Sequence, residues 1–148
     1  MKLEANTFQI NGDGYDHKLF NMKDTTTAEG WYVTSDKKTS FQINVPLVND
    51  SFEVVLSGTF PGNTPTNASV NGSTFVNVTI KNIKKIPLEA RDYGHLTGTI
   101  KITKYGAVGE KINGDFSGTY SRTDPNTGIN YTAAISNGKF ECIRRDDR

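Results

Sequence analysis

The chain has very few of the side chains from which metal centres and catalytic sites are usually built. Its 148 residues include one cysteine, Cys142, and two histidines, His17 and His95. A single cysteine excludes an intrachain disulfide, and these three side chains are too few for a usual zinc site. A cysteine nucleophile needs a histidine partner, and neither histidine lies in a recognisable motif. We therefore expect no metal or other cofactor, and we expect Cys142, beside Phe140 on a predicted strand, to be a small buried hydrophobe.

An excess of one charge is also lacking, and so is any long apolar run. Seventeen basic residues nearly cancel sixteen acidic ones. This balance argues against a nucleic-acid partner, and the short basic run 81–85 is expected to be a solvated strand end. No stretch approaches the roughly 18 apolar residues of a membrane helix.

The opening residues MKLEANTFQI contain no apolar core of a signal peptide. Either the protein is cytoplasmic, or Met1 begins a chain from which a signal segment has been removed. Thr, Asn, Gly and Ser are abundant, as in TFPGNTPTNASVNGSTF, and this composition is typical of extracellular β-proteins. We therefore expect a protein of the cell surface or outer membrane, or a secreted one.

Most of the chain alternates apolar and polar residues with the period of two that a β-strand requires. One such segment aligns Phe41, Ile43 and Val45, and Pro46 is expected to end it. A long loop is expected over 61–73. Helical patterning is confined to KKIPLEARDYGH, where Pro87 leaves room for about one turn. The pattern predicts a single all-β domain over residues 1–148, an antiparallel β-sandwich or flattened β-barrel of about 8–10 strands.

The segment INGDFSGTYSRTDPNTGINYTAAISNGKF predicts a hairpin with glycines inside its strands. Gly114 and Gly118 flank Phe116 at two residues on either side, so all three share one face. We expect Phe116 to be buried, with the glycines leaving space for facing side chains. Asn137 and Gly138 favour a bend or bulge in the second strand.

Part of the chain resembles secreted lipoprotein domains from Bacteroidetes, most of which have no assigned function. The resemblance lies in GTIKITKY, INGDFSGT and ISNGKFECI, which begin at Gly98, Ile112 and Ile135, and in the opening FQINGDGYD. It covers about a third of the chain in its strong part. It implies an all-β fold, export and, in a full precursor, a lipid-anchored N-terminal cysteine that this chain does not contain. It supplies no catalytic residues.

No recognisable catalytic motif stands out, and we expect a protein that is not an enzyme. The glutamates are spread without the paired context of a glycosidase, and there is no nucleophile elbow, P-loop or dinucleotide fingerprint. The sequence NGDGYDH offers Asn11, Asp13 and Asp16 as oxygen ligands for calcium, but it lacks the glycine and glutamate of an EF-hand loop. A glycine-rich hairpin turn is the favoured interpretation.

Exposed aromatic side chains are the remaining candidates for binding. Trp31 shares a strand face with Val33, which favours a core position, so that Tyr32 faces outward. Tyr93 and His95 flank Gly94 in what is expected to be a loop. Such rings can stack on a sugar or on a protein.

We therefore expect a non-catalytic domain that binds a glycan or a protein partner through its loops or an exposed sheet face. Two alternatives stay open. One is an assembly subunit that pairs through an edge strand, and the other is a small cytoplasmic immunity or inhibitor protein.

Overall fold

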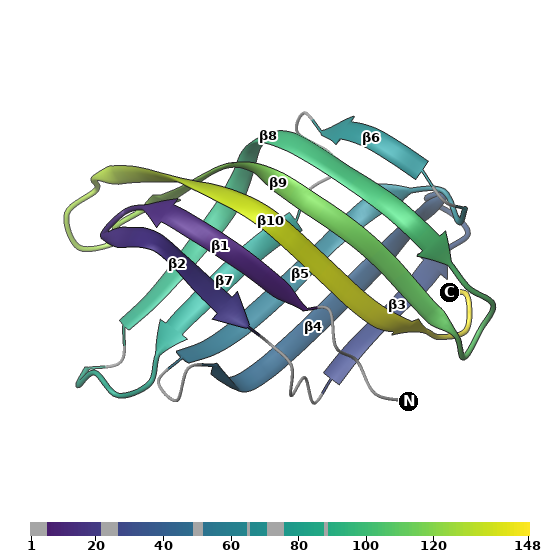
Figure 1. Ribbon diagram of the computed structural model, residues 1–148, viewed down its shortest axis with the longest axis horizontal. Coiled ribbons are helices and arrows are strands. Elements are labelled where there is room, and N and C mark those ends of the chain that lie inside the picture. The colour runs from purple at the N-terminus through teal and green to yellow at the C-terminus, as the bar shows by residue number, and fades with distance from the viewer. Residues whose placement is uncertain (1–5, 22–26, 49–51, 65, 71–75, 88) are drawn as a thin grey trace.

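The computed structural model describes residues 6–21, 27–48, 52–64, 66–70, 76–87 and 89–148, and within them every regular element is a β-strand (Figure 1). The strands are β1 (Thr7–Gly12), β2 (Tyr15–Asn21), β3 (Thr27–Val33), β4 (Lys38–Val48), β5 (Phe52–Pro61), β6 (Thr66–Val70), β7 (Val76–Asn82), β8 (Glu89–Tyr105), β9 (Lys111–Thr123) and β10 (Asn130–Arg144). The predicted all-β class and strand number are confirmed. No helix in the described part of the chain is long and apolar enough to cross a membrane.

Seven of the strands close a ring in the order β10–β3–β4–β5–β7–β8–β9 and back to β10. Outside this ring, β1 of the β1–β2 hairpin pairs with β10 between Ala133 and Lys139, and β6 pairs with β8. The ring is flattened into two layers whose strands cross (Figure 1). β8 passes from one layer to the other, since its first residues pair with β7 and the stretch from Gly94 to Tyr105 pairs with β9.

One pair in the ring departs from the antiparallel prediction. β10 and β3 run parallel and share only the pairs Ile143↔Glu29 and Arg144↔Gly30. The chain beyond β10 extends this seam. The amide of Arg145 donates to the carbonyl of Gly30, the amide of Arg148 donates to the carbonyl of Tyr32, and the amide of Thr34 donates to the carbonyl of Arg148.

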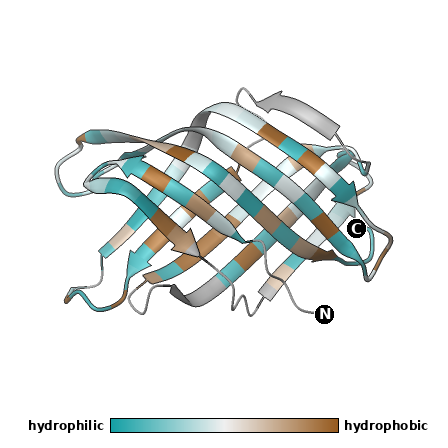
Figure 2. Cartoon of the chain, in the orientation of Figure 1, coloured by the Kyte–Doolittle hydropathy of each residue, from teal (hydrophilic) through white to brown (hydrophobic). Residues whose placement is uncertain are grey.

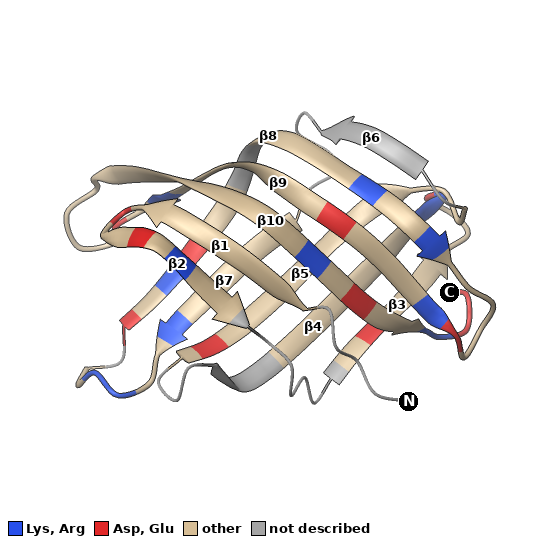
Figure 3. Cartoon of the chain, viewed as in Figure 1, with Lys and Arg blue, Asp and Glu red and all other residues tan. Residues whose placement is uncertain are grey.

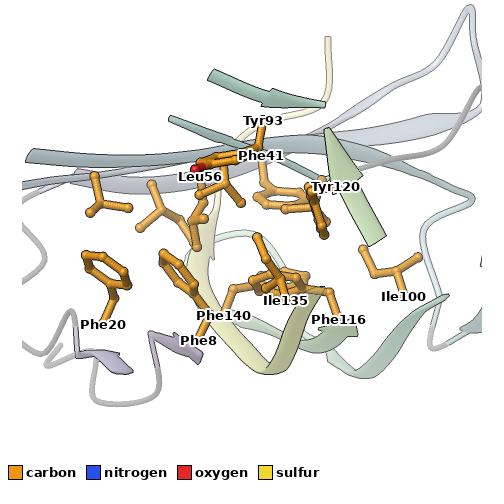
Figure 4. Packing of buried hydrophobic residues seen from close by; sticks show 14 of the residues in the cluster. Phe8, Phe20, Phe41, Leu56, Tyr93, Ile100, Phe116, Tyr120, Ile135 and Phe140 are labelled. Carbon is orange, nitrogen blue, oxygen red and sulfur yellow. The ribbon is translucent and has the colours of Figure 1, made fainter. Parts of the chain in front are cut away.

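The inward faces of the two layers form one apolar core. Hydropathy alternates along the strands, with apolar residues on the inner side (Figure 2). Six phenylalanines and two tyrosines are buried in the core: Phe8, Phe20, Phe41, Phe60, Phe116, Phe140, Tyr93 and Tyr120. Figure 4 shows all of these except Phe60 with labels. Burial of each phenylalanine contributes about 1.5–3 kcal/mol by transfer from water.

Gly114 of β9 leaves room for one of these rings, as predicted. Phe116 is 3% exposed, and Gly114 is buried on the same face of β9. A Cβ on Gly114 would lie 2.5 Å from the ring of Phe140. Gly138 lies at the predicted bulge, where the β9–β10 register shifts between Ile135 and Gly138. A Cβ there would lie 2.5 Å from the carbonyl oxygen of Phe116, so the backbone itself excludes a side chain.

Three local predictions were wrong. Pro46 does not end β4 but lies inside it, where the β4–β5 register shifts between Val45 and Val48 and the ladder is interrupted. The expected loop over 61–73 contains the short strand β6, paired to β8. The segment expected to hold one helical turn forms instead the 83–87 turn and the first part of β8.

Cys142 is fully buried, as predicted, and lies opposite Ile112 on β9. Burial raises the pKa of its thiol to about 12, and the neighbouring charge of Glu141 adds to the shift. We expect no reaction with a thiol-specific reagent in mildly alkaline buffer, because the reactive thiolate is both inaccessible and scarce. One thiol per chain should react once the protein is unfolded in guanidinium. Rapid labelling of the folded protein would contradict this burial.

Candidate functional site

Trp31 and Tyr32 lie on the opposite faces of β3 from those predicted, and both side chains are half-buried. Ala28 and Gly30 are buried on β3, so Tyr32 shares their side of the strand and is itself half-buried. Trp31 lies on the other side, where the guanidinium of Arg148 stacks over its ring at 4.3 Å. The predicted core position of Trp31 is therefore wrong. The reason is Gly30, where a Cβ would lie 3.0 Å from Sγ of Cys142, so the inner side of β3 at this point has no room for a large ring.

Tyr93 and His95 lie within β8 and not in a loop. Tyr93 is 1% exposed and belongs to the core, so its ring is not available for stacking on a ligand. His95 pairs with Tyr120 of β9 through the backbone, and its side chain lies outside the described part of the structure. The prediction of an exposed aromatic loop is wrong here, because β8 continues through Gly94 where the sequence suggested a break.

Asn11, Asp13 and Asp16 do surround a hairpin turn, the one between β1 and β2. Asp13 and Gly14 both have positive φ, 52° and 85°, as a two-residue turn between twisted strands requires. The three side chains have separate partners. Asn11 accepts from the amide of His17, and Asp16 contacts the His17 ring at 2.8 Å. No cluster of three or more metal-ligating side chains occurs among the described residues.

The carboxylate of Asp13 is the centre of a polar cluster at this end of the sandwich. Arg122 of β9 donates to both of its oxygens, from Nε to Oδ2 and from Nη2 to Oδ1 at 2.9 Å. The hydroxyl of Tyr93 donates to Oδ2 at 2.5 Å. Arg91 donates from Nη1 to the backbone carbonyl of Asp13 at 2.6 Å and from Nε to Glu89 at 2.9 Å. Two arginines and a tyrosine from neighbouring strands therefore hold the tip of the β1–β2 hairpin.

Aromatic rings complete the cluster from the outside. The guanidinium of Arg91 lies over the ring of Tyr15 at 4.8 Å, and that of Arg122 lies over Tyr131 at 4.4 Å. Each arginine is thus fixed between a ring and the Asp13 turn. The cluster joins the hairpin to β8 and β9 and holds both guanidinium groups in position.

The cluster is suited to holding charge and not to proton transfer at neutral pH. Burial pushes the pKa of Asp13 upward, but the hydrogen bonds from Arg122 and Tyr93 and the charge of Arg91 outweigh it, so the net pKa is lowered. Burial and the hydrogen bond to Asp13 raise the pKa of Tyr93. Asp13 therefore stays ionised and Tyr93 stays protonated across the physiological range.

Asp13→Asn should lower the free energy of unfolding by about 1–3 kcal/mol at neutral pH, because it leaves two arginines without their buried counter-ion. Asparagine accepts positive φ, so the turn itself should survive. The folded pKa of Asp13 is below its unfolded value, so its contribution is complete above about pH 5 and is lost as pH falls through the folded pKa.

Urea unfolding followed by tryptophan fluorescence checks this at neutral pH and at acid pH. The difference between wild type and variant should shrink in acid. An unchanged difference would mean that the charge of Asp13 is not what the cluster stabilises.

A groove of about 720 Å³ lies beside this cluster, between the turn after β7 and the turn after β9. Arg91, Arg122 and Glu89 line it together with apolar side chains from the two turns. Ile86 is 99% exposed, the most exposed of the large apolar side chains that the structure describes. Among the described residues the lining consists of Lys85, Ile86, Pro87, Glu89, Ala90, Arg91, Arg122, Asp124, Pro125 and Asn126.

A second cavity, of about 480 Å³, lies at the other end of the molecule beneath the C-terminal residues. Its lining consists mostly of that terminal segment, in which Arg144 pairs with Asp147 and Arg145 pairs with Glu29. Through those ion pairs and the backbone hydrogen bonds to β3, the C-terminal segment helps to close the ring of strands. The groove at the β7–β8 turn is therefore the better candidate for binding.

Comparison of the chain with models of protein families, with curated proteins and with solved structures gives no match. The resemblance to Bacteroidetes lipoprotein domains stays a prediction.

Sequence reasoning missed Arg91 and Arg122, the charged residues that define this site. Arg122 and Asp13 are 109 residues apart, and nothing in the residues around either one indicates the pairing. Ile86 did carry a signal, because an isoleucine between lysine and proline in a turn has no strand face on which to be buried.

Proposed function

We propose that this protein is a non-catalytic binding domain that takes a glycan or a protein partner in the groove between the β7–β8 and β9–β10 turns. The observation that carries the proposal is Ile86, a large apolar side chain left in water at the rim of a groove. An exposed apolar side chain beside fixed charged groups is typical of an interface anchor. The sheet on either side supplies a rigid support for both turns.

Binding to two defined panels tests the proposal, one of immobilised oligosaccharides and one of phage-displayed random peptides. Ligands should be selected that bind wild type and lose affinity for Ile86→Ser. Val108→Ser is the matched control, because Val108 is also an exposed apolar side chain, 51% exposed, in the turn between β8 and β9. Ligands that bind all three proteins equally would place the binding surface elsewhere.

Assembly through an edge strand is a second candidate with an observation of its own. β2 and β6 end the strand order, and each has one strand neighbour among the described residues. β2 is interrupted by a register shift and by the positive φ of His17, devices that protect an edge from pairing. The sequence Thr66–Val70 of β6 contains no charge and no proline. A molar mass that rises with concentration in light scattering would favour assembly, whereas a constant monomer mass favours the groove.

We also propose that the protein acts outside the cytoplasm, at the cell surface or outer membrane or in secreted form. Its Thr-, Asn-, Gly- and Ser-rich composition supports this location. Fractionation of the native full-length protein tests it. A soluble cytoplasmic product would instead support the immunity or inhibitor alternative.

A further inference from the structure

We propose that the partner in this groove is a protein segment that places a carboxylate beside an apolar side chain. This inference rests on the proposed function and adds the chemistry of the ligand. The side chains that line the groove and the balance of their charges support it.

The lining favours a protein over a sugar. None of the ten described residues that line the groove is aromatic, so these side chains offer no ring on which a pyranose could stack. It offers instead Ile86 and Pro87 from the turn after β7, Ala90 from β8 and Pro125 from the turn after β9. Aliphatic walls of this kind fit an apolar side chain of a peptide.

The charges that face the groove favour an anionic partner. Lys85, Arg91 and Arg122 line it against two acids, Glu89 and Asp124. The lining thus has one net positive charge, and both acids are already engaged, Glu89 by two of these same cations. Glu89 accepts from Lys85 at 2.7 Å and from Arg91 at 2.9 Å, and the carboxylate of Asp124 accepts from the amides of Asn126 and Thr127 in its own turn.

Asp13 neutralises part of the arginine charge, but it does so from behind, because its side chain is 4% exposed and does not line the groove. Lys84 precedes Lys85 in the 83–87 turn, the blue segment at the lower left of Figure 3, and Lys85 is the one that lines the groove. The side chain of Lys85 is 57% exposed and its ammonium group contacts Glu89 at 2.7 Å, so a partner carboxylate would share this ammonium group with Glu89. A carboxylate is therefore the group that the groove receives best.

The arginines are held in position before any partner arrives. Arg91 is fixed by Glu89, the Asp13 backbone and the Tyr15 ring, and its side chain is only 19% exposed. A group that is ordered in the free protein loses little freedom on binding, which favours affinity.

The test uses random peptides displayed on phage, selected on the wild-type chain and then synthesised with the selected acid or its amide. Selected peptides should share Asp or Glu next to an apolar residue. The Kd should rise about tenfold or more for Ile86→Ser, for Lys85→Gln and for the amide form of the peptide. Raising the sodium chloride concentration should weaken binding. Val108→Ser should bind like wild type.

Three other results would overturn the inference in different ways. Peptides that depend on Ile86 but carry no acid and show no salt dependence would remove the carboxylate and leave the proposed function standing. If acidic oligosaccharides such as oligogalacturonates bind in a way that depends on Ile86 and no peptide is selected, the partner is an acidic glycan and not a protein. If neither panel yields an Ile86-dependent ligand, the proposed function of the groove fails as well.

Discussion

Replacing Phe140 by alanine should lower the free energy of unfolding by about 3–5 kcal/mol. The ring of Phe140 is stacked on that of Phe41 with centroids 4.5 Å apart, and Phe116 packs beside it at 6.3 Å. These residues come from β10, β4 and β9, so the ring joins the two layers of the sandwich (Figure 4). Urea unfolding followed by the fluorescence of Trp31, the only tryptophan, measures the change.

The control is Ile129→Ala in the β9–β10 turn. Ile129 is half-exposed, so its truncation should change stability by no more than about 0.5 kcal/mol. A loss of less than about 1 kcal/mol for Phe140→Ala would mean that the stack between the layers is not formed as described.

Gly114→Ala should cost about 1–3 kcal/mol, although only one methyl group is added. The new Cβ would lie 2.5 Å from the Phe140 ring and 3.1 Å from Cδ1 of Ile102, and the ring is already held by its neighbours. Gly94→Ala on β8 is the matched control, because apart from its chain neighbours no described atom lies within 4 Å of the position of its Cβ. We expect that change to be neutral or slightly stabilising, since alanine restricts the unfolded chain more than glycine does.

The two substitutions should not be additive. When Phe140 is already alanine, the methyl group at position 114 can enter the space that the ring has left. The double variant Gly114→Ala/Phe140→Ala should therefore lose less stability than the sum of the single variants. Strict additivity would show that Gly114 is not needed to make space for the Phe140 ring.

The sequence predicted those features that depend on neighbours along one strand. Alternation placed Phe116 and Gly114 on one face, and the Asn137–Gly138 pair indicated the bulge. The NGDG turn was predicted for the same reason, because the backbone conformation of a tight hairpin selects glycine and its short polar neighbours.

Features that depend on which face or which strand is opposite could not be predicted. The position of Trp31 is decided by Gly30, and the importance of Gly30 appears only when Cys142 and Ile112 are seen beneath it. The polar cluster around Asp13 could not be predicted for the same reason. Asp13 resembles an ordinary turn residue until the fold brings Arg122 and Arg91 to it from two other strands.

The position of β10 in the ring has a consequence for the order in which the strands can pair during synthesis. β10 pairs with β1, β3 and β9, so the first strand and the last lie side by side. While β10 is still inside the ribosome, the β1–β2 hairpin has no neighbour on its β1 side and the ring stays open at β3. Such pairings close long loops, which makes folding slow. The core can therefore be completed only after β10 has emerged from the ribosome. Until then the open strand edges are exposed to other chains.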